Sequence, residues 1–361
     1  MSQVSCTEIS KTSKLRLPSI SVRLLLPSHV SPDRPKPLSQ PKSTFSRSPG
    51  SKLIVFDKLS KFFKTVEVVS KLTFDVQDKE IFGLLGPNGA GKTTSMLILC
   101  SVLKPTSGTV IINNIDLNHE ASKVRTQIGV AFQEPVLDSR LTVQQNLEFH
   151  ADACGLKSHV KAERIKDILT HLDMWEDRKQ KAGKLSGGMK KKIEDAKIFV
   201  QRPPVAIFDE PTAFLDVPSR HKVWKQIARL RDEGSTILLA TNMMDEADKL
   251  CDRVGILSKG KLVAIGTPRT LKGNLPKGDV IEIRVTQDTA RVAELVRNIP
   301  DVKDAIPLGS SNRIRIYVSH AELKMPTIME SLLRDGTHVE SIDMKEPSLD
   351  DVFLHYTGET L

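Results

Sequence analysis

The sequence lacks any apolar run long enough to cross a membrane. A membrane-spanning helix needs about 18 consecutive, predominantly apolar residues. The apolar segments at 205–208 and 237–240 have only four residues each, which suits strands in a protein core. If the protein works at a membrane, we expect a separate chain to supply the membrane-spanning part.

Cysteine is sparse, and the histidines are scattered. The four cysteines, Cys6, Cys100, Cys154 and Cys251, lie far apart and form no Cys-x-x-Cys pair, and the nine histidines show no ligand spacing. This pattern argues against a zinc site and against a disulfide framework, and it predicts reduced thiols in a cytosolic protein.

The positive charge is unevenly distributed. The formal net charge is +9, but residues 1–50 hold eight Lys/Arg and only two acidic residues, so six of the nine charges lie there. The basic balance is therefore weak support for nucleic-acid binding, and we expect no specific nucleic-acid partner. The same segment is rich in Ser and Pro and is predicted to be disordered. An organelle targeting peptide and a mis-assigned start codon are the alternatives.

A phosphate-binding loop is the central motif of the chain. Residues 86–94 fit G-x-x-x-x-G-K-[ST] and lie between an apolar stretch at 81–85 and a helical stretch at 96–99. Glycines permit the tight turn that aims backbone N–H groups at a phosphate, and the helix that follows attracts the anion. Lys92 is placed to reach the β- and γ-phosphates, and Thr93 to bind Mg²⁺. The predicted nucleotide-binding residues of the loop are Gly86, Pro87, Asn88, Gly89, Ala90, Gly91, Lys92, Thr93 and Thr94.

Two further elements complete a predicted ATPase site. The apolar strand at 205–209 ends in Asp209 and Glu210, which suit Mg²⁺ binding and the activation of water, respectively. Upstream, residues 185–189 place Ser186 and two glycines, Gly187 and Gly188, before a helix, which forms a second N-terminus suited to an anion. No single site needs two such helices, whereas a dimer does, because one subunit's loop can face the other's Ser-Gly-Gly.

The remaining pattern predicts an α/β fold with an accessory domain. Strands and helices alternate after residue 205, as in a parallel sheet covered by helices, while residues 134–200 are mostly helical. We predict an ATPase domain at 51–268, a linker at 269–278 and an accessory domain at 279–361. The accessory domain reads β-α-β-β-α-β, a ferredoxin-like arrangement. Its residues leave open whether it regulates, binds substrate or bridges a dimer.

With these motifs in order, residues 53–268 closely resemble the ATP-binding cassette (ABC) transporter ATPases. The signature LSGGQ is matched at 185–189, with Met189 in place of Gln. The resemblance implies that Gln133 touches Mg²⁺ and reports to a membrane subunit, that Phe63 stacks on adenine, and that residues 212–216 form the D-loop. It also implies a RecA-like core with an antiparallel β subdomain and a helical subdomain. Mg²⁺ would be held by Thr93, Gln133 and Asp209.

Two details resemble the daunorubicin-resistance type of exporter ATPase. They are the basic run 190–192 after the signature and the ending at 346–355. This resemblance implies an ATP-hydrolysing subunit, peripheral at the cytoplasmic face of a membrane, that powers an ABC-2-type permease on a separate chain. The exported substrate would be a drug, a lipid or another amphipathic molecule. The ATPase would act as an ATP-dependent homodimer or as a heterodimer with a second ABC ATPase.

Two further residues depart from the family pattern. Asn242 stands where the family has its switch histidine, and an amide can contact a γ-phosphate but cannot carry a proton. Either hydrolysis is slowed, which would suit a regulatory partner of a second ATPase, or Asn substitutes with modest loss. Asp195 lies on a helix face that is usually apolar, so it needs Lys191 as a partner or a changed helical register. A non-transport ABC clamp is the rival class, although such proteins carry two cassettes or a long coiled coil.

Overall fold

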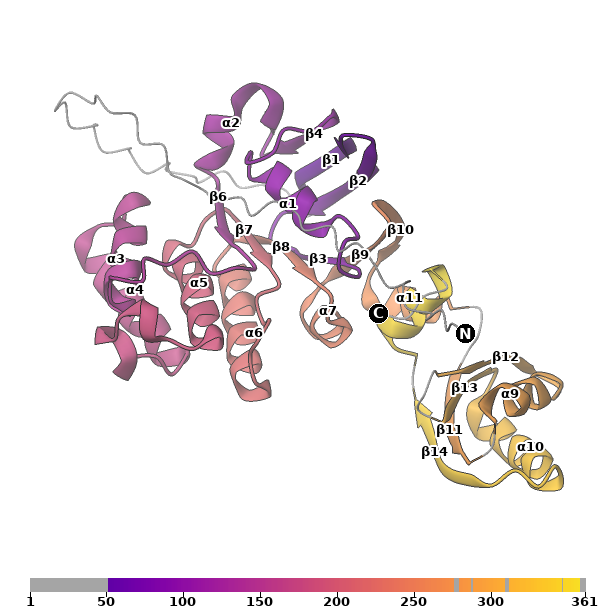
Figure 1. Cartoon of the computed structure of the whole chain (residues 1–361). Coiled ribbons are helices and arrows are strands. Elements are labelled where there is room, and N and C mark those ends of the chain that lie inside the picture. Colours follow the sequence, from indigo (N-terminus) through magenta and orange to yellow (C-terminus); the bar gives the residue numbers. More distant parts are fainter. Residues whose placement is uncertain (1–50, 276–278, 287, 309–311, 346, 358–361) are drawn as a thin grey trace, which may run out of the picture. The chain divides into compact units, whose positions relative to one another are not determined.

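The structure is a computed structural model that describes residues 51–275, 279–286, 288–308, 312–345 and 347–357 (Figure 1). The predictions of disorder or targeting for residues 1–50 lie outside the described residues. Among the described residues, no helix is both long enough and apolar enough to cross a bilayer.

A six-stranded sheet forms the centre of the ATPase domain. Its order is β10-β9-β3-β8-β7-β6, and all neighbours are parallel except β9 and β10. The strands are β3 (Ile81–Leu85), β6 (Ile128–Ala131), β7 (Val205–Asp209), β8 (Thr236–Thr241), β9 (Arg253–Ser258) and β10 (Lys261–Gly266). β3, β7 and β8 are buried at every position, as parallel strands covered on both faces are. The parallel sheet predicted from the sequence is confirmed.

The two faces of this sheet belong to different cores. Along β3, Ile81 and Leu85 join one apolar cluster, while Phe82 and Leu84 join the other. Figure 1 shows the helical part and the antiparallel β part of the domain on opposite sides of the central strands. The helices that flank the strands are α1 (Lys92–Leu99), α2 (Leu117–Arg125), α6 (Val217–Asp232) and α7 (Met244–Leu250).

An antiparallel sheet of order β2-β1-β4-β5 forms the β subdomain. Its strands are β1 (Lys52–Phe63), β2 (Val66–Gln77), β4 (Ser107–Ile112) and β5 (Ile115–Asp116). The sequence predicts separate strands at 66–69 and 72–76, but β2 is continuous. Lys71 has a φ of 46°, and the pairing register with β1 shifts nearby, so a local irregularity absorbs the break in the pattern.

The helical subdomain matches its prediction. It contains α3 (Val143–Ala153), α4 (Ser158–His171) and α5 (Gly187–Gln201), with the short 3₁₀ turns η1 (Glu176–Lys179) and η2 (Ala182–Lys184) between the last two. Thr142 and Gln145 form a capping box at the start of α3, which fixes where that helix begins.

The accessory unit is ferredoxin-like, as predicted. Its elements are β11 (Asp279–Val285), α9 (Thr289–Arg297), β12 (Val302–Pro307), β13 (Arg313–Val318), α10 (Ala321–Arg334) and β14 (Val339–Lys345). The sheet order is β12-β13-β11-β14, and every pair is antiparallel. Apolar residues of β11 and β13 pack with those of α9 and α10 into a separate core.

Two short helices modify the predicted boundaries. α8 (Pro268–Gly273) forms where the sequence predicts a linker, because Thr267 caps it by accepting a hydrogen bond from Thr270 N. The stretch predicted as a linker, 269–278, therefore contains a short helix, and residues 276–278 lie outside the described residues. α11 (Leu349–Thr357) begins after Ser348, with Asp351 N donating to Ser348 Oγ. Its buried Leu349, Val352 and Phe353 pack into the core that also contains Ile81.

Candidate functional site

The phosphate-binding loop joins β3 to α1, and its glycines are required by the surrounding backbone. A Cβ on Gly86 would lie 2.2 Å from Leu257 O. Gly91 has a φ of +104°, and a Cβ there would lie 2.7 Å from Val68 O. Side chains at either position would therefore displace backbone. The result is a tight turn whose exit is the N-terminus of α1, as anion binding requires.

Lys92 is buried at the base of this loop. Its Nζ donates to Gly86 O at 2.6 Å and to Pro87 O at 3.1 Å. Burial lowers the pKa of Lys92, while the carboxylates of Glu210 and Asp209 oppose that shift. The ammonium is thus held by neutral carbonyl groups inside the turn, where it can exchange them for phosphate oxygens.

Asp209 ends β7 with a buried carboxylate. Burial raises its pKa, and a hydrogen bond from the Thr93 side chain opposes the rise. Its Oδ1 atom is buried without a hydrogen-bond partner among the described residues. A buried, unpaired acceptor beside a threonine hydroxyl fits a hard cation with oxygen ligands. Thr93 and Asp209 therefore suit the Mg²⁺ site that the sequence predicts.

Glu210 and Gln133 meet at the same edge of the sheet. Gln133 Nε2 donates to Glu210 Oε2 at 2.8 Å, although the residues are far apart in the chain. Glu210 has a φ of 47°, and its N–H donates to Ala240 O at 2.9 Å, which turns it out of the strand direction. The structure thus brings together a predicted metal residue and the predicted catalytic base.

Asn242 follows β8 at this same carboxyl edge. In the register of the sheet, Asp209 pairs with Ala240 and Leu85 pairs with Thr241. Asn242 is half-buried one residue further on. It therefore lies at the sheet edge that carries the loop and the acid pair, and its contact with a γ-phosphate stays a prediction.

Phe63 ends β1 in the β subdomain. Its side chain is 45% exposed, and the Lys61 ammonium lies 5.2 Å from the ring centroid. Phe63 pairs with Val66 at the start of β2, the strand whose Val68 carbonyl lies against Gly91. An exposed ring on the hairpin that touches the loop can stack on a base. The position of Phe63 is therefore suitable for stacking on adenine, and that role stays a prediction.

The signature residues begin α5. Ser186 caps this helix by accepting a hydrogen bond from Met189 N at 3.2 Å. Ser186 and Gly187 are exposed, and a Cβ on Gly187 would meet no atom within 4 Å. α5 packs mainly against α3, α4, β6 and α6. This helix N-terminus is therefore accessible to a second molecule.

Sequence reasoning missed two buried acids near the site. Glu194 on α5 is fully buried, and its Oε2 accepts Val136 N at 2.8 Å. Glu246 on α7 accepts Thr212 Oγ1 and Trp224 Nε1, each at 2.8 Å. α7 has four charged residues among seven, so no local pattern distinguishes Glu246 from the exposed acids on the same helix.

The predicted partner of Asp195 is confirmed. Lys191 Nζ lies 3.4 Å from Asp195 Oδ1, and both side chains are fully buried on α5. The helix keeps its regular register at this point, so the alternative of a register change does not apply.

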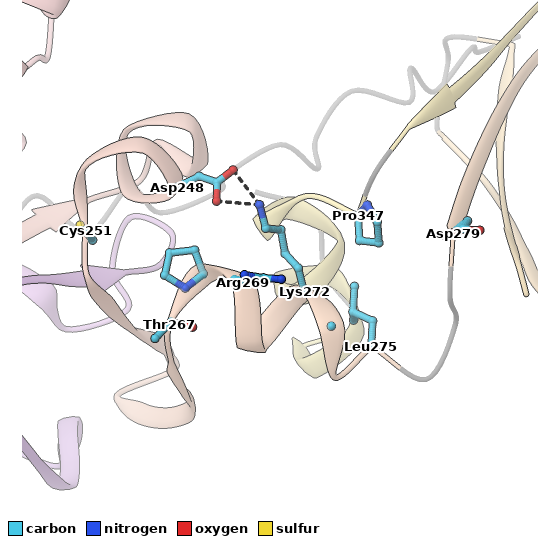
Figure 2. Close-up of a pocket in the computed structure, with 10 residues that line it drawn as sticks. Asp248, Cys251, Thr267, Arg269, Lys272, Leu275, Asp279 and Pro347 are labelled. Carbon is cyan, nitrogen blue, oxygen red and sulfur yellow. Dashed lines mark hydrogen bonds and ion pairs between the residues drawn. The ribbon is translucent and has the colours of Figure 1, made fainter. Parts of the chain in front are cut away.

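A pocket of about 810 Å³ lies elsewhere, beside α7 and α8 (Figure 2). Its lining includes Thr267, Arg269 and Lys272, and Lys272 Nζ forms an ion pair with Asp248 at 2.8 Å. None of the predicted nucleotide-binding residues lines it. Those residues instead follow the carboxyl edge of the six-stranded sheet.

Comparison with known proteins identifies the family. Residues 69–213 match the ABC transporter family, and residues 266–357 match the C-terminal domain of DrrA1-3-like ATP-binding proteins. The chain is 35% identical to the daunorubicin resistance ATP-binding protein DrrA2 of Streptomyces coeruleorubidus, covering 78% of this chain and 88% of that protein. It is 38% identical to the Nod factor export ATP-binding protein I of Burkholderia pseudomallei, covering 85% of this chain and 98% of that protein.

Solved structures agree with the fold. The dimeric structure of a bacterial ABC transporter cassette, MJ0796, matches with 25% identity and a TM-score of 0.56, covering 60% of this chain and 98% of that chain. The fold class and subfamily predicted from the sequence are confirmed. The chain belongs to the ABC transporter family, as an ATP-hydrolysing ATP-binding protein of the daunorubicin-resistance type.

Proposed function

We propose that this chain is the ATPase subunit of an exporter and powers an ABC-2-type permease on a separate chain. The observation that carries the proposal is similarity over nearly the whole length of an export ATP-binding protein, C-terminal domain included. The names of the relatives refer to drug resistance and to Nod factor export. A drug, a lipid or another amphipathic molecule is therefore the substrate class we infer. The non-transport clamp finds no support among these relatives.

Two ATPase copies would work together. One copy presents the loop at 86–94, and the exposed Ser186 and Gly187 of the other would cover the nucleotide. The dimeric cassette structure supports this arrangement, since a cassette that is similar to 60% of this chain forms a dimer. The second copy is either this chain or another ABC ATPase. The assembly would sit peripherally at the cytoplasmic face of a membrane.

The residues divide the chemistry between them. Lys92 and the loop amides would neutralise phosphate charge, and Thr93, Gln133 and Asp209 would hold Mg²⁺. When bound, Mg²⁺ would neutralise the negative charge that develops on the phosphate oxygens. Glu210 would orient and deprotonate the attacking water. Gln133 would contact Mg²⁺ and communicate the state of the ATP site to the permease.

The helical subdomain offers a surface for the permease. Val136, three residues after Gln133, is 65% exposed, and Phe149 on α3 is 71% exposed. Large apolar side chains with this exposure are common at protein interfaces. We infer that they contact the membrane subunit, which would connect its movement to Gln133.

Affinity purification tests the proposal. The tagged full-length chain is isolated from gently solubilised membranes, and the proteins bound to it are identified by mass spectrometry. We expect a polytopic membrane protein that is lost from the Phe149→Ser variant. It should be retained by Leu333→Ser, a matched control in which a side chain that is 67% exposed on α10 is altered. Recovery of soluble or ribosomal partners alone would contradict the transport function.

A second ABC ATPase in the purified complex would define a heterodimer. Its absence, with the permease present, would define a homodimer. Both outcomes keep the transport function and decide only the composition of the ATPase pair.

A further inference from the structure

Helix α5 carries three charged side chains that are fully buried. Lys191, Glu194 and Asp195 each have 0% exposure, and all lie within three turns of the signature residues. Charged groups are almost never fully buried unless they are paired or hydrogen-bonded. Their partners therefore indicate why the helix retains them.

Glu194 holds the segment around Gln133. Its Oε2 accepts Val136 N at 2.8 Å, and its Oε1 accepts Phe132 N at 3.5 Å. Lys197 pairs with the same carboxylate at 2.8 Å. One side chain of α5 thus contacts the backbone on both sides of Gln133.

Lys191 connects two segments of the ATP site. Its Nζ donates to Phe132 O at 2.8 Å and to Asp209 O at 3.1 Å. Phe132 precedes Gln133, Asp209 precedes Glu210, and the Gln133 and Glu210 side chains are themselves joined by a hydrogen bond. The Lys191 ammonium therefore links Phe132 to Asp209. These are the residues that immediately precede Gln133 and Glu210.

Asp195 completes the set. Its Oδ1 lies 3.4 Å from Lys191 Nζ, one turn along the helix. The Lys191 ammonium donates to the two carbonyl oxygens, and the Asp195 carboxylate pairs with it through charge, without a hydrogen bond among the described residues. Asp195 therefore supplies the opposite charge beside the buried ammonium.

We propose that Lys191, Glu194 and Asp195 are positioning residues of the ATPase, which tie the signature helix to Gln133 and Glu210. The proposal rests on the assignment of Gln133 and Glu210 to the ATP site. Because these contacts start from α5, a displacement of its N-terminus by a partner's nucleotide moves both residues together. The signature of one copy is thereby connected to the chemistry of its own loop.

A double variant separates positioning from simple stability. In Lys191→Met/Asp195→Leu both buried charges are replaced by apolar groups of similar size, so the fold should be retained. We expect a melting temperature near that of the wild type but a kcat for ATP at least about tenfold lower, with KM changed less than about threefold. The single variant Lys191→Arg keeps the hydrogen-bond donors. Its kcat should therefore be much closer to the wild-type value than that of the double variant. A stable double variant with wild-type kcat would overturn the proposal.

The matched control alters a pair that has the same spacing but is exposed. Glu330 and Arg334 form an i,i+4 pair on α10, with side chains 63% and 79% exposed. Glu330→Gln/Arg334→Gln should leave kcat, KM and melting temperature unchanged. This control measures the general effect of removing a helical ion pair from the chain.

Hydrogen exchange provides a readout that does not depend on turnover. In nucleotide-free Glu194→Ala the amides of Phe132 and Val136 lose their acceptor, so a peptide covering 130–138 should exchange about tenfold faster or more. A peptide covering 86–94 should be unaffected. Unchanged exchange at 130–138 would contradict the role of Glu194. If the wild type hydrolyses ATP and Glu210→Gln does not, failure of these variants leaves the proposed function intact.

Discussion

Two helices of this chain, α1 and α5, begin with glycine-rich segments. Their N-termini differ in the side chains that surround them. α1 follows a turn in which Lys92 is only 5% exposed and lies near the acids Asp209 and Glu210. α5 begins at Ser186 and Gly187, which are exposed. Both geometries suit an anion, but only the first has the candidate Mg²⁺ ligands Thr93 and Asp209 beside it. The comparison supports the proposal that one copy contributes two different halves, each to a different site of a dimer.

The two N-termini also differ in what supports them. The loop before α1 is held by backbone, since Gly260 N donates to Ala90 O at 3.0 Å. The start of α5 is capped by Ser186, which accepts a hydrogen bond from Met189 N at 3.2 Å, and the buried Lys191–Asp195 pair lies further along the same helix. The first N-terminus is thus held by backbone of the turn between β9 and β10, and the second by contacts within its own helix.

The largest effect is expected at the catalytic half. Glu210→Gln keeps a group that can bond to Gln133 but removes the base, so kcat for ATP should fall about 100-fold or more. ATP binding should persist, and an ATP-dependent dimer should accumulate in size-exclusion chromatography. The control is Glu176→Gln, where the side chain is 92% exposed. Wild-type turnover in Glu210→Gln would remove the base from the account.

The buried pair on α5 predicts a pH-dependent stability. Burial raises the pKa of Asp195 to about 7 from an ordinary 3.8, with Lys191 opposing the rise and Glu194 and Glu246 adding to it. The folded state therefore holds this proton more tightly than the unfolded state does. The contribution of Asp195 to stability is present below about pH 4 and is lost as pH rises through about 7.

Asp195→Asn tests this directly. The variant cannot titrate at this position, so its stability lacks this pH dependence. Between about pH 5 and about pH 8, the free energy of unfolding of the wild type should fall by about 2 kcal/mol relative to that of the variant. Urea unfolding at several pH values, without nucleotide, measures the difference. A difference that stays constant with pH would show that Asp195 is ionised throughout this range.

The smallest effect is expected at Asn242. An amide there can donate to a γ-phosphate oxygen but cannot carry a proton, so Asn242→His should raise kcat severalfold, by about three- to tenfold. Steady-state ATPase assays of the two proteins at equal ATP saturation measure it. Equal turnover would show that Asn substitutes for histidine without loss and would end the hypothesis of a slowed site.

The sequence predicted the parts of the site that are continuous in the chain. The loop at 86–94 and the pair Asp209 and Glu210 are local patterns whose chemistry follows from residue type and spacing. The ferredoxin-like order also followed from alternation at 280–285 and 313–318 and from the helical stretches that follow them, with only a weak strand signal at 302–307. In each case a few neighbouring residues contain all the necessary information.

The sequence did not predict features that depend on distant segments. Glu194 acts through backbone groups of Phe132 and Val136, about 60 residues earlier, and no local pattern reports such a contact. α8 depends on a threonine cap that lies just before a segment with linker composition. β6 was missed because it has only four residues, and α2 because only Leu117 and Val124 of its nine residues are buried.

Complementation between two inactive variants tests the central claim most directly. Lys92→Met should disable the loop half, and Gly187→Glu should place a negative charge at the signature half. Gly187 has open space around its Cβ position, so the second variant should fold. Each variant alone should retain less than about 1% of wild-type ATPase activity.

Mixing the two variants should restore activity. Random pairing gives half mixed dimers, each with one intact site, so about a quarter of wild-type activity is expected. That result would show that the loop of one copy works with the signature of another. Full activity of Gly187→Glu alone, or no recovery in a mixture that exchanges subunits, would contradict the account.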